Sequence, residues 1–207
     1  MKRLVFLLVG SLFVTWATKA QPLSLGGRIG IATGSYQFDS IGIDGATLEP
    51  AGDRVGGYQA AIFLRLSIPT FIYIQPELQF SQRDYVFGIK SPSQPKEYKT
   101  LKCYRIELPI LMGFKFGNVR LFGGPVWRLG SKQYSKGGGS TPLQVNFNDN
   151  DIAAMGGVGV EFDGVCLDLR YVGYLEQTTS DVRVAQQHKR VDVKHDGIVQ
   201  INFGLFF

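Results

Sequence analysis

The chain ends in the stretch Gly197-Ile-Val-Gln-Ile-Asn-Phe-Gly-Leu-Phe-Phe207, which alternates between apolar and mixed residues. One parity is entirely apolar, and its members are Val199, Ile201, Phe203, Leu205 and Phe207. Alternation with a period of two predicts a β-strand with one apolar face. Because chain ends are usually frayed and polar, a strand that stays apolar to its last residue suits lipid better than water. The last strand of a soluble β-sandwich is the alternative interpretation of this stretch.

The first twenty residues, 1–20, predict a cleaved secretory signal peptide. Lys2 and Arg3 form a basic start, the run Leu4–Phe13 is apolar, and Thr18-Lys19-Ala20 places small residues before the cut. This apolar run is too short for a convincing membrane-spanning helix. We therefore expect an exported protein, and no cysteine near the cut is available for lipid attachment.

Cleavage would leave residues 21–207 as one domain. The whole chain has 22 Lys and Arg and 17 Asp and Glu, but three of the basic residues lie in the leader, which lowers the net charge from +5 to +2. This small excess gives no argument for nucleic-acid binding. No later segment approaches the length of a spanning helix, so a membrane location would require a closed barrel.

The period-two alternation recurs along the exported domain. Besides the terminal strand, we predict strands at about 24–37, 56–68, 71–85, 100–116, 119–130 and 152–162 and one from residue 165. The connections at Pro69-Thr70, Gly117-Asn118 and Asp163-Gly164 are short, whereas 38–55, 87–99, 131–151 and 177–194 are long. Short turns that alternate with long loops are typical of outer-membrane barrels. The sequence therefore predicts an eight-stranded antiparallel up-and-down transmembrane β-barrel in the outer membrane of a Gram-negative cell.

The inner parity of these strands carries charges of both signs. On a sandwich it would be a solvated face, but the interior of an eight-stranded barrel is narrow and filled by side chains. We expect these groups to form a neutralising polar plug, which argues against a wide pore. They are Arg28, Arg65, Glu77, Arg83, Arg105, Glu107, Arg120, Arg128, Glu161, Asp168 and Arg170.

Five segments, spread in order over nearly all of the exported domain, carry a family resemblance. They are Pro76-Glu-Leu-Gln-Phe, Tyr104-Arg-Ile-Glu-Leu-Pro-Ile-Leu, Gly123-Gly-Pro-Val, Gly156-Gly-Val-Gly-Val-Glu-Phe and Leu167-Asp-Leu-Arg-Tyr. These segments resemble the PorT-like family, small outer-membrane β-barrels common in Bacteroidetes. One branch of that family is associated with protein export through the type IX secretion machinery, and no residue here marks membership of it. The resemblance to outer-membrane proteins also implies that Phe207 is a signal for the barrel-assembly machinery.

The two histidines, His188 and His195, lie in or beside the last long connection, close to Ser180 and Asp181. Outer-membrane barrels include lipid-modifying enzymes in which a histidine acts as a base, so a lipid A-modifying enzyme is one hypothesis. The preferred interpretation is a polar loop that contains histidines by chance. We therefore expect no catalytic residue.

The two cysteines, Cys103 and Cys166, are expected to be free thiols that face the lumen. Cys166 follows a short turn and Cys103 lies near a long connection, which separates them by more than the roughly 7 Å that a disulfide spans. The histidines lie away from both, so we expect no metal site and no cofactor. The run Gly137-Gly-Gly-Ser140 lacks the ending of a phosphate loop and is interpreted as a flexible connection.

The basic residues Lys189, Arg190 and Lys194 would lie where lipopolysaccharide phosphates lie, although solvated loop charges look the same. The sequence as a whole predicts a monomeric, non-enzymatic barrel that contacts outer-membrane lipid and acts as an envelope or interaction component. A role as an accessory part of a secretion or envelope complex is included in this prediction. A lipid-modifying enzyme and a narrow channel are the alternatives.

Overall fold

The structure is a computed structural model. It describes residues 23–37, 41–43, 46–50, 54–68, 71–91, 94–136, 143–147, 152–174, 178–184 and 187–207. The predicted leader, the turn Pro69-Thr70 and the run Gly137–Ser140 lie outside these ranges. Within the described ranges, no helix is long and apolar enough to cross a membrane.

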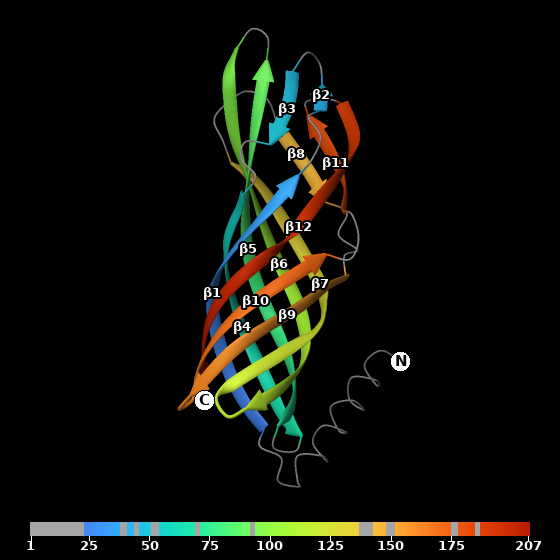
Figure 1. Ribbon diagram of the computed structural model, residues 1–207. Coiled ribbons are helices and arrows are strands. Elements are labelled where there is room, and N and C mark those ends of the chain that lie inside the picture. The colour runs from blue at the N-terminus through green and yellow to red at the C-terminus, as the bar shows by residue number, and fades with distance from the viewer. Residues whose placement is uncertain are drawn as a thin grey trace, which may run out of the picture.

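Eight long strands form one closed antiparallel sheet, as predicted. They are β1 Leu23–Gln37, β4 Arg54–Ile68, β5 Ile72–Ser91, β6 Gln94–Phe116, β7 Val119–Lys136, β9 Ile152–Phe162, β10 Val165–Tyr174 and β12 Gln187–Phe206. Each pairs with the next in chain order, and β12 pairs back onto β1 to close the barrel (Figure 1). The carboxyl terminus lies at the end of the barrel that carries the short turns.

Four further strands extend the sheet beyond the opposite end of the barrel. They are β2 Ile41–Ile43, β3 Ala46–Pro50, β8 Leu143–Phe147 and β11 Thr178–Val184. β2 pairs with β3, which pairs with the upper part of β5, and β11 lies between β8 and the start of β12 (Figure 1). The connections 38–55, 131–151 and 177–194 are long, as predicted, but contain these short strands, and most of 87–99 belongs to the extended ends of β5 and β6. β8 does alternate, with Leu143, Val145 and Phe147 separated by Gln144 and Asn146, so the sequence carried a strand signal there.

The two short turns that the structure describes have the backbone of hairpin connections. Asp163 and Gly164 have positive φ angles of 44° and 82°, and Gly117 has a φ of 58°. Two successive positive φ angles are typical of type I′ turns, which match the twist of paired strands. The dipeptide Asp163-Gly164 thus fixes the register of β9 against β10.

The terminal strand has the orientation that the alternation predicts. Its apolar parity points outward, with Phe207 the most exposed at 80%, while Gln200 and Asn202 are buried inside the barrel. The other strands repeat this arrangement, so the exterior is apolar around the barrel. Such a surface is typical of a sheet that faces lipid.

Outward aromatic side chains form two rings around the barrel. The ring near the turns contains Phe71, Phe114, Phe116, Phe162 and Phe207, and the other contains Tyr58, Phe80, Tyr104, Trp127 and Tyr171. Phe114 and Tyr104 lie ten residues apart on β6. At roughly 3.3 Å per residue and a tilt of about 40°, the two rings are about 25 Å apart, the height of the apolar band of an outer-membrane barrel.

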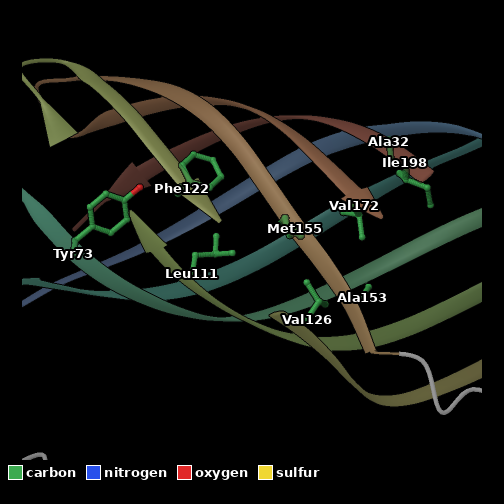
Figure 2. Packing of buried hydrophobic residues seen from close by; sticks show 9 residues of the cluster. All are labelled: Ala32, Tyr73, Leu111, Phe122, Val126, Ala153, Met155, Val172 and Ile198. Carbon is green, nitrogen blue, oxygen red and sulfur yellow. The ribbon is translucent and has the colours of Figure 1, made fainter. Parts of the chain in front are cut away.

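The apolar core lies inside the barrel rather than between layers. It is made by Ala32, Tyr73, Leu111, Phe122, Val126, Ala153, Met155, Val172 and Ile198, which come from seven of the eight barrel strands (Figure 2). Tyr73 and Phe122 stand at one end of this cluster and Ala32, Val172 and Ile198 at the other (Figure 2). Charged groups adjoin the cluster at both ends, as described below.

Candidate functional site: ion network of the lumen

The predicted lumen charges point into the barrel. Nine are buried, with at most 4% of their surface exposed: Arg28, Arg65, Glu77, Arg83, Arg105, Glu107, Arg120, Asp168 and Arg170. Arg128 and Glu161 are half-buried. The structure brings these groups together in two clusters rather than one.

The larger cluster begins at Glu77 of β5, which holds two guanidinium groups. Arg28 of β1 donates to both carboxylate oxygens of Glu77. Arg170 of β10 donates to the same carboxylate from the other side, with 3.0 Å from Nη1 to Oε2. Gln75 donates to Oε1 of Glu77 at 2.6 Å, and Gln79 accepts from Arg28 at 3.0 Å. Glu77 is therefore the centre of a buried network that joins three strands.

From Arg170 the network continues toward the turns. Arg170 Nη2 donates to Asp168 Oδ2 at 2.6 Å, and Asp168 Oδ1 accepts from Arg120 Nη2 at 2.6 Å. Arg120 Nε lies 3.3 Å from Glu161 Oε2, which also accepts from Arg65 Nη1 at 2.5 Å. The result is a ladder in which cations and carboxylates alternate from Arg28 to Glu161.

Inward glycines make room for this ladder. A Cβ on Gly159 would lie 2.2 Å from Asp168 Oδ1 and 3.2 Å from Arg120 Nη2. A Cβ on Gly113 would lie 2.3 Å from the Tyr73 ring. In a narrow barrel, long side chains must lie flat against the wall, and glycine on the neighbouring strand provides the space.

We expect Gly159→Ala to destabilise the barrel by about 1–3 kcal/mol, because the new methyl group displaces the carboxylate of Asp168 from its two guanidinium partners. The measurement is urea unfolding of the barrel refolded in lipid. Gly156→Ala on the same strand is the matched control, since a Cβ there meets nothing nearer than 3.8 Å. Equal losses for both variants would contradict this prediction.

The second cluster lies at the other end of the core. Arg83 and Arg105 both donate to the phenol oxygen of Tyr174, the latter at 3.2 Å, and Arg83 Nη2 lies 3.7 Å from Glu107 Oε1. Gln79 also donates to Glu107, at 3.0 Å. Because Tyr174 packs against the apolar core and Phe122 packs under Arg170 at 4.8 Å, the core lies between the two clusters.

A cavity of about 320 Å³ opens at the turn end of the lumen. Arg65 lies beside it, with its guanidinium 4.5 Å from the ring centres of both Tyr73 and Phe206. Phe206 in turn meets Phe63 edge to face at 5.1 Å. Lys115 closes one side and donates to Glu161 at 2.8 Å. The penultimate residue of the chain thus helps to build the mouth of the barrel.

Several of these residues were absent from the predicted site. Lys115 and Phe206 both occupy the inner parity of their strands, so the alternation could have identified them. The buried amides Gln59, Gln75 and Gln79 were also absent from it, although they share the parity of the charges, whereas Gln200 faces the lumen as the alternation of the terminal strand predicts. The predicted site contained only charged residues.

Both cysteines are buried and neither forms a disulfide, as predicted. In the described ranges, no group of three or more His, Cys, Asp or Glu residues is placed to hold a metal ion.

The histidines and the basic residues near the end of the chain lie in strand β12, and not in a loop. In the backbone register His188 is opposite Arg183, and His195 is opposite Tyr36. The three basic positions Lys189, Arg190 and Lys194 face Val182, Asp181 and Gln37 in the same way.

No protein-family model and no curated protein matches this chain. Solved structures do match. The outer membrane protein OprG from Pseudomonas aeruginosa has a TM-score of 0.57 at 13% identity, over 90% of this chain and 97% of that one. The fold is that of small outer-membrane barrels.

Two further structures are similar over most of their length, but with TM-scores too low to add to this assignment. Neisserial surface protein A has a TM-score of 0.48 at 15% identity, over 91% of this chain and 100% of that one. The attachment invasion locus protein Ail of Yersinia pestis has a TM-score of 0.44 at 15% identity, over 89% of this chain and 99% of that one.

Proposed function

We propose that the chain is a monomeric integral outer-membrane barrel, exported with a cleaved leader, that serves as a non-enzymatic anchor for interactions at the cell envelope. The observation that carries this proposal is the ion ladder in the lumen. Its central groups Arg28, Glu77, Asp168 and Arg170 are almost completely excluded from solvent and hold one another across the barrel. An aqueous diffusion pore needs a wider barrel with wetted walls.

Such an anchor would bind its partner on the part of the sheet that lies beyond the apolar band. There β2, β3, β8 and β11 widen the sheet around the ends of β5, β6 and β12 (Figure 1). A rigid paired sheet presents a fixed surface to a partner at a lower entropic cost than a disordered loop does. We propose a protein partner at this surface.

The resemblance to the PorT-like family extends this proposal to an accessory role in protein secretion or in another envelope complex. Basic side chains at Lys189, Arg190 and Lys194 would add a contact with lipopolysaccharide phosphates, because Arg and Lys bind phosphate well. Phe207 would direct the chain to the barrel-assembly machinery. These three assignments are separate proposals.

Two measurements test the central proposal. The purified barrel in planar bilayers should show no conductance steps, and steady open-pore currents would overturn the role of a plugged anchor.

Affinity purification from the native outer membrane should recover a partner with the full chain. It should lose that partner when the β2–β3 hairpin and the β11–β12 hairpin are shortened while the barrel strands are kept. Recovery of the same partner by the shortened chain would place the interaction elsewhere.

The enzyme alternative has its own test. We expect that replacing His188 and His195 together with glutamine leaves the lipid A of the host unchanged by mass spectrometry. The comparison requires equal amounts of folded barrel in the outer membrane. A lost or altered acyl chain in the variant would restore the lipid-modifying hypothesis.

A further inference from the structure

The ion ladder of the lumen is not electrically balanced. Its eight charged groups are joined in one series by ion pairs: Arg28, Glu77, Arg170, Asp168, Arg120, Glu161, Arg65 and Lys115. Five of them are cations and three are carboxylates. The four arginines are buried and Lys115 is half-exposed. Buried charges need partners, so this excess of positive charge favours an anion that the side chains of this ladder do not supply.

The excess is located at the turn end of the ladder. Glu77 and Asp168 each lie between two guanidinium groups, whereas Glu161 is shared by three cations. Two of those cations, Arg65 and Lys115, line the 320 Å³ cavity. The missing negative charge and the free volume therefore coincide.

The cavity also has hydrogen-bond donors to spare. Lys115 Nζ uses one of its three N–H groups, on Glu161, and its side chain is 38% exposed. Ser24, Ser67 and Tyr73 also line the cavity.

The apolar wall of the cavity consists of Phe71, Ile72 and Phe206. At about 300 Å³ a cavity is at the small end of the range for ligand sites. It has room for one charged head group and a short apolar part.

We propose that this mouth cavity binds a phosphate monoester. A phosphate monoester carries between about −1.5 and −2 charges at pH 7, which matches the excess of the ladder, whereas a carboxylate carries only one. Lys115 and Arg65 face the phosphoryl group, and the apolar wall takes the esterified part. The ester is either a soluble metabolite or the head group of a lipid such as phosphatidic acid, since the cavity lies at the height of the aromatic ring near the turns, where lipid head groups lie.

Titration calorimetry on the folded barrel tests the soluble source, with phenyl phosphate as the probe. We expect saturable binding at one site, tighter than for benzoate, which has the same ring and one charge. Binding should weaken between pH 7 and pH 5, as the phosphate becomes a monoanion with a pKa near 6. Equal binding of benzoate and phenyl phosphate would contradict the phosphate assignment.

The lipid source is tested in nanodiscs of phosphatidylcholine with and without phosphatidic acid. Native mass spectrometry then counts the lipid that stays on the released barrel. One retained phosphatidic acid supports the proposal with a lipid as the ligand. Absence of specific retention here, together with no saturable binding of phenyl phosphate, would overturn it.

Lys115→Gln tests whether this cavity is the binding site, because the charge of this exposed side chain can be removed without leaving a void in the core. We expect about tenfold weaker binding, or loss of the retained lipid, since one charged hydrogen bond is removed. Lys102→Gln is the matched control, a lysine of similar exposure on the same strand near the opposite end, 3.9 Å from Asp84. Unchanged binding by the Lys115 variant would exclude this cavity as the site and would leave the anchor function untouched.

Discussion

Glu77→Gln is expected to destabilise the barrel by about 3–5 kcal/mol, the largest loss for any single lumen substitution. The carboxylate of Glu77 is buried and accepts hydrogen bonds from Arg28, Arg170 and Gln75. Glutamine has a similar shape but no charge, so Arg28 would lose its carboxylate partner and Arg170 would keep only Asp168, which it shares with Arg120. Breaking a buried ion pair by removing one partner costs this much because the remaining charge stays desolvated.

The measurement is urea unfolding of the refolded barrel in lipid vesicles, followed by the loss of its heat-resistant compact form on gels. Asp84→Asn is the matched control, because Asp84 forms a partly exposed pair with Lys102 at 3.9 Å. Such a pair contributes about 0–1 kcal/mol. A Glu77 variant no less stable than the Asp84 variant would show that the ladder contributes little to stability.

A second substitution separates the lost charge from the lost hydrogen bonds. In Glu77→Gln with Arg170→Met, one of the two cations that contact Glu77 is replaced by an apolar chain that can pack on Phe122. We expect this double variant to regain part of the lost stability, since apolar replacements of buried ionic groups are often neutral or stabilising. If the double variant instead lost as much stability again as Glu77→Gln alone, Arg170 would act through packing, and not through its charge.

The alternation of residues was sufficient to predict the barrel and the direction of its side chains. The terminal strand is the clearest case, because lipid on one face and a polar lumen on the other impose opposite residue types on successive positions. That constraint ends where the sheet leaves the lipid. The strands there are short: β8 alternates Leu143, Val145 and Phe147 with polar residues over only five positions, and it pairs with β11, which in turn pairs with β12.

The candidate site was predictable as a set of residues but not as a set of contacts. Arg28 and Glu77 lie 49 positions apart, and their contact depends on the strand tilt and on the register across β4. Parity alone carries no information on either. For the same reason, the excess of positive charge at the turn end could not be predicted. Lys115 belongs to the ladder only because of its position along β6 and its contact with Glu161.

The last two residues are expected to have separate roles that a pair of alanine substitutions can distinguish. Phe206 points inward, where it packs on Phe63 and Arg65. Phe207 points outward, and its ring covers Gly27, where a Cβ would lie 3.4 Å from it. Both keep their backbone bonds in an alanine variant, from Phe206 N to Gly164 O and from Phe207 N to Leu25 O, each 2.8 Å.

Phe206→Ala should lower the free energy of unfolding by about 2–3 kcal/mol in the purified barrel, somewhat less than the 3–5 kcal/mol for a fully buried phenylalanine. It removes the ring that packs at the closure between β12 and β1 beside the mouth cavity.

Phe207→Ala should change the free energy of unfolding by less than about 1 kcal/mol, because truncating a ring that is exposed to lipid removes few packing contacts. In cells the Phe207 variant should show the larger defect if the assembly machinery recognises Phe207. This variant should reach the periplasm and yet be depleted from the outer membrane. Normal assembly of the Phe207 variant, with a stability loss confined to Phe206, would leave the terminal residue as part of the lipid-facing ring alone.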